Sequence, residues 1–304
     1  MTNDKNIKSK FIGGIIIEKK YWIWFSMLKI ENRIKHELLK MYGNPKNIWN
    51  LHKDAIKNFK YECSNELRND CYKTNLNKVM EYMKSKNIKV ITIDDEEYPD
   101  NLKAIDFPPI VLYAIGNVEL LKQKSIAVIG CRLCSDYGKN TAKVVANILS
   151  KNKVVVVSGM ARGIDKYAHL GALEECNSTI AVLGSGVDYV YPYENKKIYE
   201  NIIARDGLII SEYPVGSVPD AKNFPERNRI ISGLSEGIVV IEAKEHSGSF
   251  ITVEYALSQG KDVFAVPGNI NSVNSTGTNR LIYEGAIPII NINMVSEIAK
   301  NIKK

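Results

Sequence analysis

The pattern of apolar and polar positions changes near residue 105 of this 304-residue chain. From there onward, short runs rich in valine and isoleucine alternate with segments long enough for a helix. Most of the runs are continuous rather than alternating, as expected for parallel strands with helices on both faces. The pattern predicts an α/β fold with an extended, Rossmann-like, doubly wound and mostly parallel sheet. The eight strand candidates are "IVLYAIG", "SIAVIG", "VVVVSG", "TIAVLG", "LIISEY", "GIVVIEA", "DVFAVPG" and "IPII".

Before that point the chain is rich in Lys, Asn and Glu, and its apolar residues recur at helical spacing. We expect one helical run over Tyr21–Gly43 and another over Glu62–Lys86. "IKVITIDD" then predicts a short strand, and "EEYPDNLKAIDFPP" predicts an extended connector punctuated by proline. The chain is therefore expected to hold a small helical N-terminal domain with a connecting arm in residues 1–104, followed by a Rossmann-like domain in residues 105–304.

Glycine recurs where the predicted strands end, which is where open α/β sheets bind their ligands. Glycine lets backbone amides approach a ligand closely, and the helix N-termini just beyond supply positive dipole ends. Tight turns between strand and helix also favour glycine, so each glycine taken alone is ambiguous. Because two arginines accompany the set, we expect a phosphate-binding rim. Its candidates are Gly130, Arg132, Ser135, Gly159, Arg162, Gly163, Gly184, Gly186, Gly248 and Ser249.

The stretch "FPERNRIISGLS" places two arginines and an asparagine at the start of a predicted helix. Arg227 and Arg229 are two residues apart, about 200° around the helix, so they cannot serve the same contact. In our interpretation Arg227 braces the strand ends, for example by pairing with Glu212 or Glu242. Arg229 would then be exposed and able to contact phosphate, and Asn228 between them is a further candidate.

No complete nucleotide-binding or catalytic motif accompanies these candidates. The sequence has no GxxxxGK[ST] stretch, and "GSGVDY" lacks the third glycine of a dinucleotide-binding loop. The four histidines are widely spaced, and His169 is more typical of a structural residue than of a catalyst. "EHSGSFITVE" offers hydroxyls near a helix start, where they usually cap, but no partnered base. We therefore expect a protein that is not an enzyme and that uses no cofactor or metal.

Composition adds modest constraints. The chain is 45% hydrophobic and 25% charged, and its formal net charge of +7 permits anionic partners without requiring them. Five cysteines, an odd number with one CxxC pair in "CRLC", favour a reduced cytoplasmic protein over a disulfide scaffold or zinc site. The start of the chain lacks a signal-peptide core, and no apolar run approaches the length of a membrane span. We expect no membrane association.

Taken together, several long motifs resemble those of the DNA-processing protein A family (DprA, also called Smf). In chain order they are "AVIGCRLCSDYG", "SGMARGIDKYAHLGAL", "VLGSGVDYVYPYEN", "ISEYPVGSVPDAKNFPERNRIISGLS", "VVIEAKEHSGSFITVEYALSQGKDVFAVPG" and "GTNRLIYEGA". The connector "YPDNLKAIDFPPIVLYAIGN" is similar to that of the family as well, so the resemblance covers residues 88–290. The N-terminal helices match the family's variable leading domain only by position.

This resemblance implies an extended Rossmann fold, homodimers, single-stranded DNA binding, protection of incoming strands, and loading of the recombinase RecA onto them in natural transformation. It implies no enzymatic activity. The phosphate-contacting arginine of the family's G-[ST]-R motif corresponds to Arg132, although Cys131 replaces the Ser or Thr and removes a hydroxyl. The family also places a lysine and an aromatic residue near the DNA, for which Lys222 and Phe224 are the candidates. Many relatives carry a C-terminal winged helix, which we expect to be absent because the chain ends at Lys304, soon after its last strand.

The residue types fit this implied function, because single-strand binders combine cations that follow the backbone with aromatics on which bases stack. The arginines and the lysine named above supply the cations, and Phe224 or Tyr137 supplies the aromatic. Two alternatives stay open. "SGSFITVEYALSQGK" followed by "VFAVPG" also resembles the phosphate loop of Rossmann-type nucleoside-monophosphate phosphoribohydrolases (the "lonely guy" group), with Glu254 as the candidate acid. The other alternative is a protein-interaction scaffold with a vestigial pocket.

Overall fold

A computed structural model describes residues 18–51, 66–67, 70–174 and 179–302. Its N-terminal part is helical, with a helix over residues 18–27 followed by further helices among the described residues. These are α2 (Asn32–Tyr42), α3 (Pro45–Trp49) and α6 (Asp70–Ser85). The start of the second expected run, residues 62–65, and residues 68–69 lie outside the described residues.

The single helix expected over Tyr21–Gly43 is wrong, because the chain turns at residues 28–31 between two helices. The turn lets Leu28 and Leu38 pack into one apolar cluster from both sides. A helix end leaves its last carbonyls without intrahelical partners. Here the buried side chain of Lys35 donates to the carbonyl oxygen of Ser26 at 2.9 Å, which satisfies one of them.

Among the described residues, the chain from Lys89 onward forms one nine-stranded sheet with helices on both faces, and all eight strands expected after residue 105 are confirmed. Its strands are β1 (Lys89–Thr92), β2 (Val111–Gly116), β3 (Ser125–Ile129), β4 (Val155–Ser158), β5 (Thr179–Val182), β6 (Leu208–Ser211), β7 (Gly237–Val240), β8 (Asp262–Ala265) and β9 (Ile287–Pro288). Their order is β1-β2-β6-β5-β4-β3-β7-β8-β9. The parallel part of the sheet consists of β6, β5, β4, β3, β7, β8 and β9, in that spatial order. Strand β2 pairs antiparallel with both β1 and β6. The fold is thus the expected doubly wound, mostly parallel α/β sheet.

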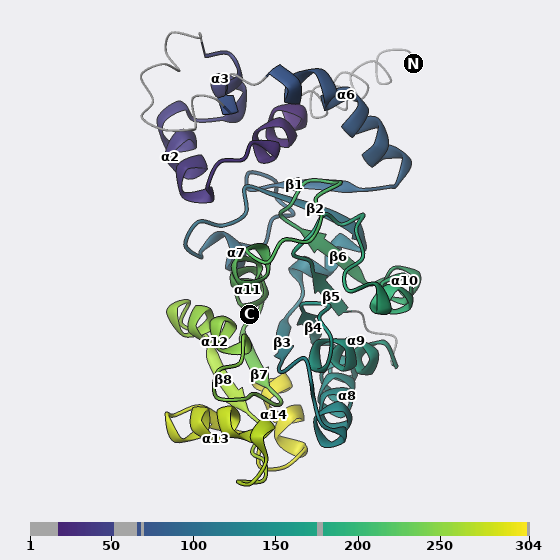
Figure 1. Ribbon diagram of the computed structural model, residues 1–304, viewed down its shortest axis with the longest axis vertical. Helices are drawn as coiled ribbons and strands as arrows, with labels where there is room; N and C mark the ends of the chain where they lie inside the picture. The colour runs from purple at the N-terminus through teal and green to yellow at the C-terminus, as the bar shows by residue number, and fades with distance from the viewer. Residues whose placement is uncertain (1–17, 52–65, 68–69, 175–178, 303–304) are drawn as a thin grey trace, which may run out of the picture.

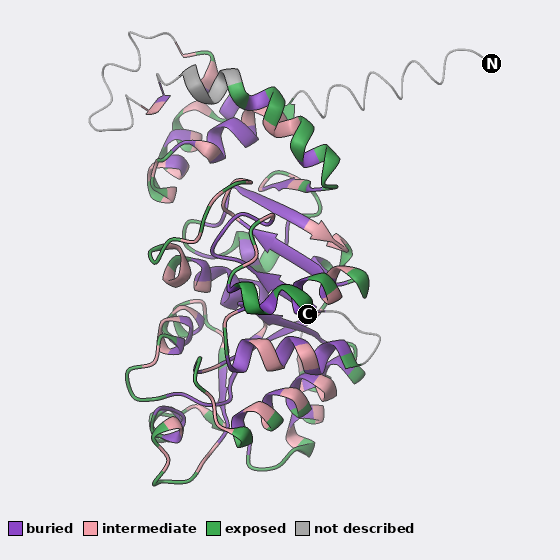
Figure 2. Ribbon diagram, turned by 45° about the vertical axis from the view of Figure 1, so that its right-hand side comes forward, coloured by how far each residue is buried: buried purple, intermediate pink, exposed green. Residues whose placement is uncertain are grey.

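Helices cover both faces of this sheet, which explains why the strands are continuously apolar (Figure 2). Alternate side chains point to opposite faces, so that Val155 and Val157 enter one core cluster while Val156 enters another. The first face carries α7 (Asp100–Lys103), α11 (Asn223–Leu234), α12 (Ser249–Ser258) and α13 (Thr276–Tyr283). The second carries α8 (Asp136–Lys151), α9 (Ile164–Glu174), α10 (Lys196–Ala204) and α14 (Asn293–Asn301).

The N-terminal helices pack on the sheet at its β1–β2 end, as Figure 1 shows. Tyr113 of β2 is buried there, and its hydroxyl lies 2.6 Å from the Ser26 hydroxyl. The connecting arm belongs to the core of the sheet as well. Leu102 and Ile105 pack in the same cluster as Ile230 of α11. The packing is therefore continuous across residue 105, and the arm helps to hold α11 in place.

Candidate nucleic-acid interface

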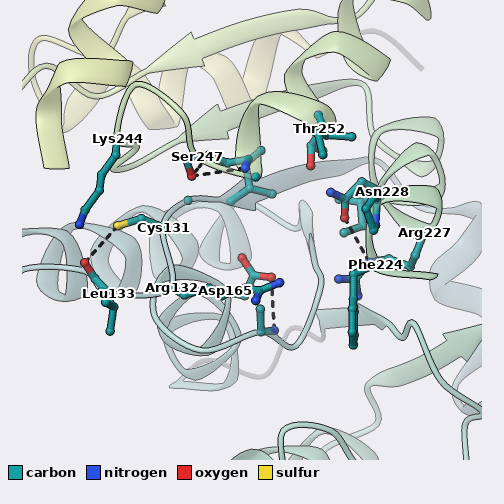
Figure 3. A pocket seen from close by; sticks show the side chains of 18 of the residues that line it. Cys131, Arg132, Leu133, Asp165, Phe224, Arg227, Asn228, Lys244, Ser247 and Thr252 are labelled. Atoms are coloured by element: carbon teal, nitrogen blue, oxygen red, sulfur yellow. Dashed lines mark hydrogen bonds between the residues drawn. The ribbon is translucent and has the colours of Figure 1, made fainter. Parts of the chain in front are cut away.

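A hollow of about 800 Å³ opens where the strand order of the sheet reverses. Strand β3 has β4 on one side and β7 on the other, so the chain segments that leave β3 and β7 diverge at their carboxyl ends. Open α/β sheets bind ligands in this crevice. The hollow is lined by residues after β3, residues after β7, and the first turns of α11 and α12 (Figure 3).

The loop that carries Arg132 is held in place by Glu242, at the end of β7. The buried Glu242 carboxylate accepts hydrogen bonds from the Ser135 backbone amide at 2.9 Å and from the Ser135 hydroxyl. The Glu242 carbonyl oxygen accepts from the amide of Cys131 at 2.8 Å. The loop is thus tied down on both sides of Arg132. In the part of the chain that the structure describes, the exposed Arg132 guanidinium has no hydrogen bond or ion pair, and it lines the hollow.

Two side chains of this loop turn inward rather than toward a ligand. Ser135, a predicted phosphate contact, accepts from the Gly138 amide at 3.1 Å as the N-cap of α8 and donates to Glu242. The Cys131 thiol lies 3.5 Å from the Leu133 carbonyl oxygen and 3.8 Å from Glu242 Oε2. Burial and the neighbouring Glu242 carboxylate raise the pKa of Cys131 to about 12. Both side chains therefore shape the loop. Because the side chain at position 131 points inward, replacing the family's Ser or Thr with Cys131 removes no donor that would face a ligand.

Arg227 braces the strand ends, as the helical geometry predicted, but it pairs with neither of the two acids that we expected. Its buried guanidinium donates to the carbonyl oxygen of Gly159 at 2.7 Å and to that of Val182, after β4 and at the end of β5. Burial lowers the pKa of Arg227 to about 10, although the Asp165 carboxylate close by opposes the shift. Burial likewise raises the pKa of Asp165, which accepts from the Gly159 amide at 3.2 Å.

The expected exposure of Arg229 is wrong. Arg229 is buried, and it meets Glu212 with two parallel contacts, Nη1 to Oε1 at 3.0 Å and Nη2 to Oε2 at 2.7 Å. Burial acts to lower the pKa of Arg229, but Glu212 outweighs it and raises the pKa above the usual value. The folded sheet places the end of strand β6 beside α11. Glu212, which follows β6, therefore meets Arg229 rather than Arg227. Arg229 is thus already paired and does not line the hollow.

The ring of Phe224 stands at the mouth of the hollow and also lines a smaller hollow beside it. It is seated on Gly184, where an added Cβ would lie 2.8 Å from the ring. The side chain of Asn223 fixes the start of the helix by donating to the Gly184 carbonyl oxygen at 3.0 Å. Gly184 was expected to offer its amide to phosphate. It instead makes room for the aromatic ring.

Most glycines of the predicted rim serve such close packing. A Cβ on Gly159 would lie 2.7 Å from Arg227 Nη2, and one on Gly186 would lie 2.8 Å from the Pro214 carbonyl oxygen. Gly163 has a φ of +70°, which favours glycine, and a Cβ there would lie 2.5 Å from the Arg132 carbonyl oxygen. Gly163, Gly184 and Gly186 line neither hollow, and Gly159 lines only the smaller one.

Gly130, Gly248 and Ser249 do line the large hollow. A Cβ on Gly248 would meet nothing within 4 Å, so the chain is open there at the N-terminus of α12. That end carries the positive pole of the helix, which favours anions. Around the large hollow, this segment and the Arg132 loop are therefore the parts of the predicted rim that a phosphate can approach.

Among the residues that line the hollow but were not predicted as site residues are Lys244, His246 and Tyr191. Lys244 directly follows "IVVIEA", and its position after the strand next to β3 could have marked it once the strand order was known. Lys222 is exposed beside α11 and lines neither hollow, and Arg162 lines the smaller hollow while paired with Glu194 at 3.1 Å.

The remaining sequence candidates lie elsewhere. The Tyr137 hydroxyl donates to the Pro267 carbonyl oxygen at 3.1 Å, outside the hollow. His169 is buried with Nδ1 2.8 Å from the Thr179 hydroxyl, and burial lowers its pKa to about 3, so it is a neutral structural residue. Glu254, the acid needed for a phosphoribohydrolase, is exposed on α12 and does not line the hollow. Among the described residues, no cluster of His, Cys, Asp and Glu is suited to a metal ion.

The hollow therefore combines two cations on one rim, Arg132 and Lys244, with the start of α12 and with an aromatic ring on the facing helix. Neither cation has a hydrogen bond or ion pair with another described residue. Asn228 lines the hollow between the two groups, and its amide oxygen accepts from Arg227 Nε at 3.3 Å. The NH₂ group of Asn228 has no acceptor among the described residues. Such an arrangement suits a flexible anion that carries flat apolar groups.

Comparison with known proteins points the same way. The sequence model of the family described as DNA recombination-mediator protein A matches residues 89–300. The DNA processing protein DprA of Streptococcus pneumoniae is 46% identical over 196 residues, 64% of this chain and 68% of that protein. Protein Smf of Synechocystis is 35% identical over 286 residues, 91% of this chain and 72% of that protein.

Two solved structures share the fold. The X-ray structure of the Streptococcus pneumoniae DNA processing protein A has a TM-score of 0.76 and 35% identity, covering 94% of this chain and 98% of that one. The Helicobacter pylori DNA processing protein A, solved for its single-stranded DNA binding mode, has a TM-score of 0.65 and 33% identity, covering 71% of this chain and 97% of that one. None of the described helices is long and apolar enough to span a membrane.

Proposed function

Because this chain belongs to the DNA recombination-mediator protein A family, we propose that it binds single-stranded DNA in the hollow between β3 and β7. One observation carries the proposal: the loop around Arg132 is fixed by Glu242, yet the Arg132 guanidinium itself is unpaired among the described residues. A rigidly held, free guanidinium at a strand end is suited to a phosphate. The relative from Helicobacter pylori binds single-stranded DNA, which supports the same ligand here.

The backbone of the strand would lie across the Arg132 rim. Arg132 and Lys244 supply two cations from neighbouring segments, and the open start of α12 at Gly248 supplies a positive helix pole. These groups recognise phosphate and not base edges. Binding should therefore depend little on sequence and strongly on salt.

The bases would face α11. Phe224 offers the face of an aromatic ring at the mouth of the hollow, and base–aromatic stacking is tolerant of sequence because every base has a π-face. Asn228 beside it can donate a hydrogen bond to a base or a phosphate. A duplex would hide its base faces by stacking, so this geometry favours a single strand.

From family membership we further propose that the protein protects incoming single strands in the cytoplasm, acts as a homodimer, and loads the recombinase RecA in natural transformation or recombination. It does so without an enzymatic step or a cofactor. Purified protein should speed the formation of recombinase filaments on a single strand. Filament formation at an unchanged rate would contradict the loading role while leaving DNA binding in place.

The binding proposal is tested by titrating a labelled single strand with the protein at several salt concentrations. We expect binding that weakens linearly on a log–log plot against salt, with a slope of about −0.7 for each phosphate contacted. A duplex of the same length should bind more weakly, because its base faces are inaccessible. No binding of the single strand at low salt would overturn the proposal.

A further inference from the structure

Exposed tyrosines alternate along the segment between β5 and α10, and one of them, Tyr191, lines the hollow. Tyr189, Tyr191 and Tyr193 expose 43%, 48% and 74% of their surface. The two residues between them face inward, since Pro192 is buried and Val190 packs against the core. Alternate positions of this segment thus place all three rings on the outer surface. We call Tyr189, Tyr191 and Tyr193 the tyrosine ridge.

The tyrosine ridge continues the aromatic surface of the hollow. The centroid of the Tyr191 ring lies 5.5 Å from that of Phe224, with 31° between the planes. Tyr191 and Phe224 both line the large hollow and the smaller one next to it. An aromatic surface therefore runs from the mouth of the hollow onto the loop.

Cations accompany the ridge on this path. Arg162 lines the smaller hollow with Tyr191, and the Lys196 ammonium lies 5.7 Å from the centroid of the Tyr193 ring. Aromatics interleaved with cations form the surfaces on which single strands stack their bases and neutralise their phosphates.

Two hydroxyl groups of the ridge make no hydrogen bond within the described part of the fold. Among the interactions of the described residues, neither the Tyr191 hydroxyl nor the Tyr193 hydroxyl has a hydrogen-bond partner. The Tyr193 ring is mostly exposed and lines neither hollow. Three aromatic rings on five consecutive residues cost solubility unless a partner covers them, and flat faces beside cations suit nucleobases.

We propose that the tyrosine ridge is a second stacking site, which takes the bases that follow once the single strand has passed Phe224. This inference rests on the proposed function, and it adds that the binding footprint extends beyond the hollow. The path runs from the Arg132 rim past Phe224 to Tyr191 and then Tyr193. Affinity gained along the ridge comes from stacking, so it should depend on strand length more than on salt.

The test uses oligothymidylates of about 4 to about 16 nucleotides, the range of single-strand site sizes. Tyr193→Ala is the informative variant, because Tyr193 lies outside both hollows, and Tyr193→Phe is its matched control, which keeps the ring. The shortest strands, which fill only the hollow, should bind all three proteins equally. Long strands should bind wild type and Tyr193→Phe alike, and bind Tyr193→Ala about tenfold more weakly, as expected for one lost stacked base.

Failure of the proposed function and failure of the ridge inference give different binding results. If wild type binds no strand of any length, the proposed function itself fails. If wild type binds but Tyr193→Ala matches it at every length, the ridge inference alone fails. In an independent crosslinking experiment, irradiated strands that carry 5-iodouracil should crosslink to the peptide that contains Tyr191 and Tyr193. Crosslinks confined to the Phe224 peptide would overturn the ridge.

Discussion

Arg229 and Glu212 form a two-point ion pair inside the protein, with contacts of 3.0 and 2.7 Å. The Asn32 side chain of α2 donates to the same carboxylate at 2.9 Å. Glu212 follows β6, so this one carboxylate joins the sheet, the N-terminal helices and α11. Since α11 also carries Phe224 and Arg227, the pair fixes the helix that faces the hollow.

Breaking this pair should destabilise the protein strongly. Glu212→Gln keeps the shape but leaves a buried guanidinium without a counter-charge, which typically costs about 3–5 kcal/mol. The free energy of unfolding in urea measures the loss. Asn32→Ala removes only a hydrogen bond to the same carboxylate and should cost about 1–3 kcal/mol. A Glu212→Gln variant as stable as wild type would contradict the structural role of the pair.

Replacing both partners separates stability from DNA binding. Glu212→Leu combined with Arg229→Met removes the two charges together, and such exchanges are often neutral for stability. If Arg229 only holds α11, the folded double variant should bind single-stranded DNA almost as tightly as wild type. A folded double variant that loses DNA affinity would make Arg229 a DNA contact after all.

Arg132→Ala should weaken single-strand binding by about tenfold or more without unfolding the protein, because hydrogen bonds to charged groups contribute about 1.5–3 kcal/mol. The slope of log affinity against log salt should also become shallower by about 0.7. The matched control is Arg33→Ala, an exposed arginine of α2 paired with Glu37 and remote from the hollow. Equal affinities for Arg132→Ala and wild type would remove Arg132 from the site.

Gly184→Ala should weaken single-stranded DNA binding by displacing the Phe224 ring. The new methyl group would lie 2.8 Å from the ring, so the ring must shift away from the mouth of the hollow. We expect weaker single-strand binding, in the same direction as Phe224→Ala. The Gly184→Ala/Phe224→Ala double variant should be no weaker than Phe224→Ala alone, because the ring is already absent. Additive losses in this cycle would show that Gly184 contacts the strand directly.

Glu194→Gln should tighten single-strand binding. Glu194 pairs with Arg162 at 3.1 Å beside the smaller hollow, so a phosphate must compete for that guanidinium. The pair is about half exposed and worth only about 0.2–1 kcal/mol, which corresponds to a gain of up to about fivefold. The gain should be measured at low salt with a long strand. A weaker-binding Glu194→Gln variant would mean that Arg162 needs the acid to hold its position.

Lys35 should make stability depend on pH. Burial lowers the pKa of Lys35 to about 8 from 10.5, although Glu212 and Glu66 oppose the shift. Between these two values the unfolded chain binds more protons than the folded one, so this group makes the protein more stable as pH rises. The change from pH 7 to pH 10 is about 2–3 kcal/mol.

The contribution of Lys35 is isolated by comparison with Lys35→Met, because other groups titrate in the same range. The free energy of unfolding of Lys35→Met minus that of wild type should fall by about 2–3 kcal/mol between pH 7 and pH 10. A difference that is constant with pH would show that the Lys35 pKa is not lowered in the folded protein.

The sequence determined the local features of this protein. Continuous β-branched runs predicted eight strands correctly, because a strand buried on both faces must be apolar throughout. Helical geometry separated Arg227 from Arg229, since two residues span about 200°. The position of the candidate site, at the carboxyl ends of the strands, also followed from the α/β pattern alone.

Only the tertiary structure decided which groups meet. Glu242 holds Ser135 from 107 residues away, and Glu212 takes Arg229 rather than Arg227 because β6 ends beside that face of α11. The tertiary structure likewise packs the Phe224 ring against Gly184, whereas it leaves Gly248 open toward the hollow. Such partners depend on strand order and on distances between segments remote in sequence. Local periodicity contains no information on strand order or on distances between remote segments. The sequence therefore located the rim of the sheet, and the fold decided which side chains line the hollow.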